Sequence, residues 1–245
     1  MVEHSHHSGV VRFVVEQPVV LGDITLHEAA AHHAHVRRFG VGDRVAITDG
    51  LGSRGFGRVA SLEKKQLVAL IDGVELVAAP PPIHLFLPVA DRDRMLWLAE
   101  KSVELQITSW NPVMFRRSRS VVPRGDGEGF ERKVRARMIA ALEQSGGAWL
   151  PTMEPMREAA SVPRGSDGRA YALDRGGPSL GRVPMEAPIS LMVGPEGGYD
   201  TDELATVRRR DWTTASLGDL TLRFETAAVA AVAVARARLA PEHEG

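Results

Sequence analysis

The chain has 245 residues, with 30 Lys and Arg against 31 Asp and Glu, and a formal net charge of -1. It contains no cysteine, which excludes a disulfide scaffold, a thiol enzyme and a cysteine-ligated zinc or iron–sulfur protein. Hydrophobic residues make up 44% and charged residues 25% of the chain, as in an ordinary globular protein. The near-zero charge argues against unselective coating of nucleic acid, but it leaves room for local basic faces.

The sequence gives no sign of a membrane segment. The longest apolar run, residues 226–235, is far shorter than the roughly 20 residues that a membrane-spanning helix needs, and Arg236 and Arg238 close it. The N-terminal residues lack the cationic start and apolar core of a secretory signal. We therefore expect a cytoplasmic protein with no membrane partner.

The first third of the chain is expected to form a small β-barrel, because residues 10–77 alternate short β-type runs with glycine turns. Thr25 and Glu28 have the spacing of a capping box and predict a helix that stops at Gly40. Residues 79–82, Ala-Pro-Pro-Pro, break regular structure, so we place a linker there, between a domain 1–78 and a domain 83–245. The predicted strands are residues 10–16, 43–49, 55–61, 66–71 and 74–77.

Beyond the linker, apolar strands alternate with longer helical patterns. This alternation predicts an α/β domain with a parallel sheet and helices on its faces. The polar, glycine-rich stretches 123–129 and 163–184 are interpreted as surface loops. The predicted strands are residues 83–87, 107–113, 189–193 and 213–217, and the predicted helices are residues 92–105, 130–144, 201–209 and 225–239.

The most distinctive motif is residues 191–200, in which an apolar strand runs into a glycine turn and then into a helix. In open α/β sheets, ligands bind where the carboxyl ends of strands meet helix starts. The glycines would let a ligand approach the main chain, where the amides of residues 196–198 could donate hydrogen bonds. The chain has neither a P-loop nor Gly-x-Gly-x-x-Gly, and acidic residues around Glu196 would repel phosphate. The motif favours a neutral or cationic ligand, with a plain tight turn as the alternative.

A second motif, residues 217–227, is again a loop that leads into a helix. It places Arg223, Glu225 and Thr226 at the helix start, ahead of an alanine-rich helix that can pack closely against another element. The alternative is that Glu225 or Thr226 only caps the helix.

The nine histidines do not predict a metal site. His32, His33 and His35 form a cluster, but it lacks a paired carboxylate and a second cluster that would complete a coordination shell. We therefore expect no bound metal.

Taken together, these motifs resemble the RsmE family of 16S ribosomal RNA uridine-N3 methyltransferases, in the SPOUT class. The resemblance covers nearly the whole chain, and its most specific parts are residues 193–198 and 217–227. The remaining, individually weak parts follow in the same order: residues 12–14, 35–39, 41–45, 49–50, 100–105, 116–118, 143–146 and 150–151.

The resemblance implies a PUA-like β-barrel that helps to hold RNA, followed by a SPOUT α/β domain with a C-terminal trefoil knot. It implies S-adenosyl-L-methionine as methyl donor, a homodimer through the knotted domains, and N3 of one uridine in the 16S ribosomal RNA of the small subunit as acceptor. Because N3 must lose a proton, Glu225 is a candidate general base, and Arg223 is expected to contact the base or its phosphate. The expected cofactor-binding residues are Leu191, Val193, Gly194, Pro195, Glu196, Gly197, Gly198, Leu217, Gly218, Leu222 and Thr226, and the expected RNA-binding residues are Arg12, Arg37, Arg38, Arg116 and Arg117.

The chain departs from the family pattern at Asp91, Gly147 and Leu220, where the family commonly has a cation. Each departure removes a charge that could contact RNA phosphate, although Arg92, Arg94 and Arg124 could compensate. Two alternatives therefore stay open: a catalytically weak RNA-binding or ribosome-assembly factor, and a methyltransferase that acts on another RNA nucleoside.

Overall fold

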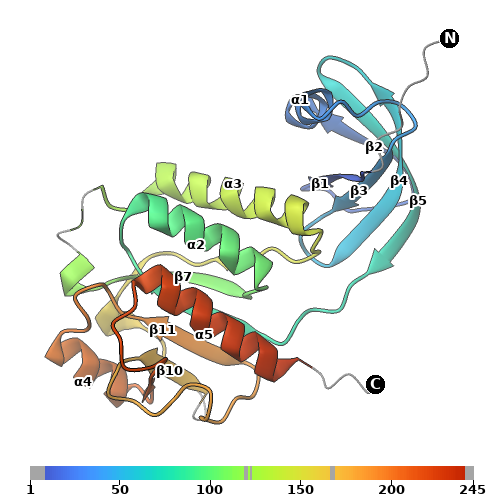
Figure 1. The fold of residues 1–245 in the computed structure, drawn as a ribbon. Coiled ribbons are helices and arrows are strands. Elements are labelled where there is room, and N and C mark those ends of the chain that lie inside the picture. Colours follow the sequence, from blue (N-terminus) through green and yellow to red (C-terminus); the bar gives the residue numbers. More distant parts are fainter. Residues whose placement is uncertain (1–8, 119–120, 122, 166–168, 241–245) are drawn as a thin grey trace. The chain divides into compact units, whose positions relative to one another are not determined.

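The computed structural model describes residues 9–118, 121, 123–165 and 169–240. The chain folds into two compact units (Figure 1). The first unit consists of Met1–Ala79 together with Leu142–Leu150, and the second consists of Pro80–Ala141 together with Pro151–Gly245. The boundary falls in the proline-rich segment that we interpreted as a linker.

The N-terminal unit is built on a five-stranded sheet in the order β1-β3-β4-β5-β2. Only β1 and β3 pair in parallel within it, and α1 packs against β2 and β5. Along β5, Leu67, Ala69 and Ile71 are buried in the core, whereas Leu70 between them is exposed. This alternation buries one face of the sheet and leaves the side chains of the other face more exposed. The elements are β1 (Val11–Val14), β2 (Gly22–His27), α1 (Glu28–Val36), β3 (Arg44–Thr48), β4 (Ser53–Leu62) and β5 (Gln66–Leu76).

The predicted capping box at Thr25 is wrong. Thr25 lies in β2, opposite Val68 of β5, because Ile24 and Leu26 on either side of it alternate into the core. The helix begins at Glu28, and its N-cap residue, His27, makes no capping hydrogen bond with its side chain. The alternation of buried and more exposed residues in a strand therefore decides the structure of residues 24–26, and the spacing of Thr25 and Glu28 does not.

The C-terminal unit is an α/β domain with a parallel sheet, as predicted. The strand order is β12-β10-β11-β6-β7-β8, and β9 also pairs with β7. Helix α5 packs on β6, β11 and α2, while Val207 of α4 shares a core cluster with Met192 of β11. The elements are β6 (Ile83–Pro88), α2 (Arg92–Glu104), β7 (Ser109–Met114), η1 (Arg116–Ser118), α3 (Glu128–Ser145), β8 (Thr152–Met153), β9 (Arg157–Glu158), η2 (Ala159–Ser161), β10 (Ala170–Leu173), β11 (Ile189–Val193), α4 (Thr201–Arg209), β12 (Thr213–Ala215) and α5 (Phe224–Leu239).

Strand β10 corrects the interpretation of residues 163–184 as a surface loop. Its first three residues, Ala170, Tyr171 and Ala172, are almost completely buried, and the strand lies between β11 and β12. A buried strand of a parallel sheet shows no alternation of apolar and polar residues. Because β10 has only four residues, no alternation and a glycine-rich surrounding sequence, the sequence did not predict it as a strand.

The segment Leu142–Leu150 belongs to the N-terminal unit, although the sequence suggested a continuous domain from residue 83. The indole N–H of Trp149 donates to the carbonyl of Val77 at 3.0 Å, and the amide of Leu150 donates to the carbonyl of Gly50 at 2.8 Å. A long-range contact of this kind has no signature in local sequence.

Among the residues that the structure describes, none of the helices combines the length and the apolar content that crossing a bilayer requires.

Candidate functional site

Three neighbouring parallel strands of the C-terminal unit end at one cavity of about 270 Å³. The turn after β11, residues 194–199, and the loop after β12, residues 216–222, both line it, together with the end of β10. The two motifs that the sequence singled out are thus brought together at the edge of the sheet where ligands bind in open α/β folds. The lining residues are Leu173, Asp174, Arg175, residues 193–199, residues 216–218, residues 220–222, Phe224 and Ala227.

Tyr199 fixes the turn after β11. Its hydroxyl donates to the carbonyl of Met192 at 3.0 Å, and its ring packs edge-on against Phe115. Burial raises the pKa of Tyr199, and the carboxylates of Asp174 and Glu203 raise it further, so the hydroxyl keeps its proton. A Cβ atom on Gly194 would lie 3.1 Å from the Tyr199 ring, closer than an ordinary contact. A glycine at position 194 therefore lets the turn close over this ring.

The loop after β12 is anchored at its base. The hydroxyl of Ser216 donates to the carbonyl of Gly218 at 3.0 Å and accepts from the amide of Gly218 at 3.1 Å. Gly218 has a φ of 133°, which side chains rarely tolerate. Farther along, Leu220 lies 81% exposed. The loop is thus held by hydrogen bonds at Ser216 and Gly218, and its side chain at Leu220 is exposed.

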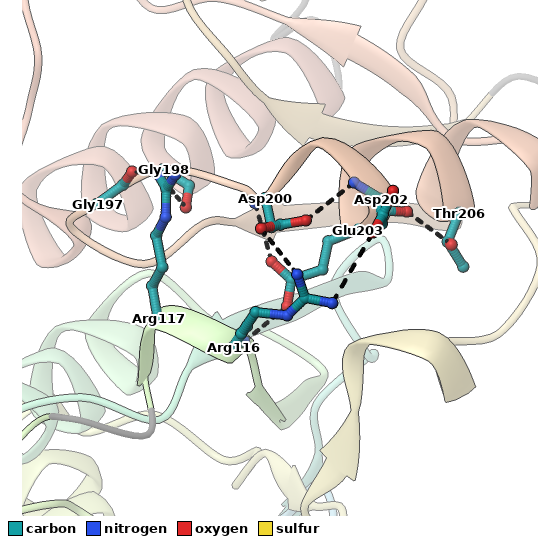
Figure 2. A network of polar contacts seen from close by, with 8 residues as sticks. All are labelled: Arg116, Arg117, Gly197, Gly198, Asp200, Asp202, Glu203 and Thr206. Carbon is teal, nitrogen blue, oxygen red and sulfur yellow. Dashed lines mark hydrogen bonds and ion pairs between the residues drawn. The ribbon is translucent and has the colours of Figure 1, made fainter.

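Arg116 connects η1 to the first turn of α4 (Figure 2). Its backbone N–H donates to Glu203 at 2.6 Å, and its guanidinium group donates to Asp200 at 3.1 Å. The same two acids form the capping box of α4, in which the amide of Asp200 donates to Glu203 at 2.9 Å. Arg116 therefore supports the helix that leaves the glycine turn.

Arg117 reaches the glycine turn itself (Figure 2). Its guanidinium group donates to the carbonyls of Gly197 and Gly198. A Cβ atom on Gly197 would lie 2.8 Å from the Arg117 side chain, so a larger residue at position 197 would displace Arg117. Of the two arginines that we expected at the RNA, Arg117 thus contacts the turn and Arg116 contacts the start of α4.

Arg94, in the first turn of α2, joins the two motifs electrostatically. It forms an ion pair with Glu196, and its Nε lies 3.9 Å from Oε1 of Glu225. The side chain of Glu225 is only 13% exposed, and its Oε2 is buried without a hydrogen-bond partner among the described residues. A buried polar atom without a partner is unfavourable, and a catalytic role is one of the reasons why a fold keeps such an atom.

A model of the RNA methyltransferase domain matches residues 78–236, which is more than half of the chain. The chain belongs to the RNA methyltransferase family. A second model, the RNA methyltransferase PUA domain, matches residues 26–72. The predicted fold class, a PUA-like domain followed by an α/β methyltransferase domain, is confirmed.

This RNA methyltransferase is similar to two curated proteins named ribosomal RNA small subunit methyltransferase E. The protein from Synechocystis is 25% identical over 236 residues, covering 92% of this chain and 77% of the relative. The protein from Rickettsia conorii is 26% identical over 222 residues, covering 85% and 88%. Among solved structures, ribosomal RNA small subunit methyltransferase E from Neisseria gonorrhoeae, bound to S-adenosyl methionine, has a TM-score of 0.84 at 26% identity and covers 94% of this chain and 98% of its own.

Most of the cofactor-binding residues that we predicted for this methyltransferase line the cavity. Leu191 and Thr226 do not. Leu191 is fully buried within β11, and Thr226 is exposed in the first turn of α5. Those that line it are Val193, Gly194, Pro195, Glu196, Gly197, Gly198, Leu217, Gly218 and Leu222.

The two predicted catalytic residues flank the start of α5. Arg223 is its exposed N-cap residue and makes no capping hydrogen bond with its side chain, while Glu225 faces Arg94. Buried Phe224 lies between them and lines the cavity. Their proposed chemistry stays a prediction, but they adjoin the cavity.

The predicted RNA-binding residues divide between the units. Arg116 and Arg117 lie in the C-terminal unit, whereas Arg12, Arg37 and Arg38 lie in the N-terminal unit. Arg37 and Arg38 are exposed just beyond the end of α1, and Arg12 projects from β1.

Sequence reasoning missed three residues of the methyltransferase site. Asp174 and Arg175 line the cavity directly after β10, and Arg94 links the two motifs. The available signal was the apolar run 170–173 followed by two charged residues, the pattern of a strand that ends at a site. The described residues contain no group of three or more His, Asp or Glu side chains arranged to hold a metal ion.

Asp91, one of the departures from the family pattern, has a structural role. Its carboxylate is the N-cap of α2 and accepts from the amides of Asp93 and Arg94, each at 3.1 Å. It thereby begins the helix that presents Arg94 to the site.

Proposed function

We propose that this protein transfers a methyl group from S-adenosyl-L-methionine to N3 of a uridine in 16S ribosomal RNA. The observation that carries the proposal is that the turn after β11 and the loop after β12 line one cavity, at the ends of β10, β11 and β12. Membership in the RNA methyltransferase family supports the reaction class. The likeness to the Neisseria gonorrhoeae enzyme, whose structure is bound to S-adenosyl methionine, supports the donor.

The chemistry of the lining suits such a donor, which when bound would supply a methyl group on a positively charged sulfur. The carboxylate of Asp174 lines the cavity and suits a cation or a hydroxyl group. Glu196 is already paired with Arg94, so its charge is partly balanced. Main chain at Gly218 can approach a ligand closely because no side chain intervenes. The residues present therefore fit the donor.

Glu225 is the proposed proton acceptor. Methyl transfer breaks the carbon–sulfur bond and forms a carbon–nitrogen bond to N3, and the N3 proton must leave. Arg94 faces Oε1 of Glu225, and this leaves the buried Oε2 to accept the proton. The exposed guanidinium group of Arg223, two residues earlier, is placed to contact the uracil ring or its phosphate. The target uridine must be unpaired or turned out of its stack to reach these groups.

The proposal includes a trefoil knot, a homodimer through the C-terminal unit and a cytoplasmic location. Apolar surface in this unit, at Trp97 and Leu220, which are 45% and 81% exposed, supports the dimer. Sedimentation equilibrium tests it: the mass of two chains is expected, and a monomer at micromolar concentration would contradict it.

Methyl transfer into small ribosomal subunits from a strain that lacks the protein tests the function. We expect N3-methyluridine in the digested RNA by mass spectrometry, and calorimetry should show one donor site per chain. A methyl group on a ribose or another base would favour a different nucleoside target. Folded protein that binds RNA but no donor would favour an RNA-binding or assembly factor, an alternative kept open by the uncharged Gly147 and Leu220.

A further inference from the structure

The outer face of the sheet in the N-terminal unit carries a second cavity, of about 380 Å³. Residues from β1, β3 and β4 form its floor, and residues from the segment Leu142–Leu150 line one side. Its size lies within the range of about 300–1,000 Å³ that is typical of small-molecule sites. Four arginines line it, against two carboxylates, those of Asp72 and Glu143.

The strand register explains how these side chains meet. Arg12 lies beside Ala46, which in turn lies opposite Phe56, so the three form one row across β1, β3 and β4. The small side chain of Ala46 leaves space between the guanidinium group of Arg12 and the Phe56 ring, which is 39% exposed. The row therefore offers room for a flat ligand group that packs against the Phe56 ring.

The neighbouring row contains Arg44 directly opposite Arg58. Like charges directly opposite each other on paired strands are destabilising. Neither arginine, nor Arg12, forms an ion pair with a described residue, and the side-chain hydrogen bond that Arg58 makes, at 3.1 Å, is to the neutral carbonyl of Gly42. An anion bound at this row would relieve the repulsion.

Arg54 provides the contrast within the same cavity. It pairs with Glu75 at 2.5 Å, donates to the carbonyl of Gly146 at 2.8 Å and lies 5.9 Å from the centre of the Phe56 ring. Its charge is used in the fold, in the ion pair with Glu75. The three arginines without an ion pair are therefore the ones available to a ligand.

We propose that this cavity holds an unpaired nucleotide of the substrate RNA, with its base against Phe56 and its flanking phosphates on Arg12 and on the Arg44–Arg58 row. The inference rests on the proposed function, since it assumes that RNA is the substrate. Single-stranded RNA is commonly recognised by bases that stack on aromatic side chains of a sheet beside a basic surface.

The positions of the cations favour a nucleotide within a chain over a free one. Arg58 lies two residues from Phe56, about 7 Å along β4, and Arg12 lies two strands away, about 10 Å across the sheet. A nucleotide within a chain carries a phosphate on both sides of its sugar and can reach both positions. A free nucleotide with one phosphate group can occupy one of them.

Fluorescence anisotropy with a labelled single-stranded RNA of 12 nucleotides tests the proposal on the full chain. Arg44→Ala/Arg58→Ala should weaken RNA binding at least about tenfold, and it should make the slope of log affinity against log salt shallower by about 1. Phe56→Leu should weaken binding about tenfold without changing the slope. Phe56→Trp keeps an aromatic ring at this position and should bind RNA with about the affinity of wild type. Donor affinity by calorimetry should stay within about twofold of wild type in every variant.

A matched control removes two positive charges from the turn between β4 and β5. Lys64→Ala/Lys65→Ala should change RNA affinity less than about twofold, since neither residue lines the cavity and the ion pair of Lys65 with Glu28 is exposed. An equal loss in this control would show that diffuse charge is responsible and would overturn the proposal. If the arginine pair does not fold, Arg44→Gln alone should still give a several-fold loss.

Two competitors distinguish the ligand. Uridine 5′-monophosphate and the same RNA annealed to its complement should each compete at least about tenfold more weakly than the single strand. Equal competition by the mononucleotide would assign the cavity to a free nucleotide, and equal competition by the duplex would assign it to helical RNA; either result overturns the proposal. If wild-type protein methylates RNA and the variants bind RNA with normal affinity, the cavity is not an RNA site, and the proposed function still holds.

Discussion

The donor cavity in the C-terminal unit and the arginine-lined cavity in the N-terminal unit are built from different parts of the chain. The cavity in the C-terminal unit is formed by turns and loops after parallel strands, with glycine main chain at Gly194 and Gly218. The cavity in the N-terminal unit is formed by side chains on a sheet face, with arginines around Phe56. A ligand of the first is positioned mainly by loop shape, while a ligand of the second is positioned by charge and an aromatic ring. Single substitutions should therefore affect the two cavities independently.

The largest effect is expected from Glu225→Gln. If the buried Oε2 of Glu225 accepts the N3 proton, its loss should lower the turnover number about 100-fold or more, because general bases contribute about 10²–10⁴ to rates. Donor affinity should stay within about twofold, since Glu225 does not line the cavity. Single-turnover methylation with labelled donor measures the rate, and Glu131→Gln on the exposed surface of α3 is the control. Turnover close to wild type would exclude Glu225 as the base.

Gly194→Val should weaken donor binding about 100-fold. The new side chain would press on the buried Tyr199 ring and open the turn, and overpacking of this kind costs about 1–3 kcal/mol. Calorimetry measures the donor affinity, and Gly181→Ala is the control because its Cβ atom would have space. RNA binding through the N-terminal unit should persist. Simultaneous loss of both affinities in a folded variant would contradict the independence of the two cavities.

Arg116→Ala should have a moderate effect. It removes the exposed ion pairs with Asp200 and Asp202 but keeps the backbone N–H that donates to Glu203. Exposed pairs contribute about 0–1 kcal/mol, so donor affinity should fall about two- to fivefold and the melting temperature about 2–4 °C at most. Arg164→Ala removes a comparable exposed pair with Asp211 and should leave donor affinity unchanged. A loss above tenfold would place Arg116 in direct contact with the donor.

The smallest effect is expected from Glu143→Gln in the N-terminal unit. Burial raises the pKa of Glu143 above its ordinary value of 4.5, partly offset by the hydrogen bond from the amide of Val14. The folded protein therefore holds this proton more tightly than the unfolded chain does, so stability falls as the pH rises above 4.5 through the folded pKa. The variant should melt about 1–3 °C higher than wild type at pH 7 and at the same temperature near pH 4. A lower melting temperature at pH 7 would show that the charged form is stabilised.

Local patterns predicted most elements, and the reasons are visible in particular residues. Strand β11 and helix α4 have the predicted bounds because an apolar run, a glycine turn and the acids of a capping box occur consecutively. Strand β2 was missed because Thr25 suggested a cap, and β10 was missed because it is only four residues long and buried. The two-residue strands β8 and β9 were also not predicted. All four are strands whose pairing with another strand, rather than local propensity, decides the structure.

The sequence by itself determined the order of the elements, the two glycine motifs that line one cavity, and the resemblance to a methyltransferase family. Each of these depends on residues close together in the chain, whose spacing is written in the sequence. Only the tertiary structure decided that Arg94 joins Glu196 to Glu225, that Arg117 contacts the glycine turn, and that Arg44 and Arg58 lie opposite each other beside Phe56. These contacts depend on strand register and on distant segments meeting, because burial of the core, and not local spacing, sets which side chains face each other.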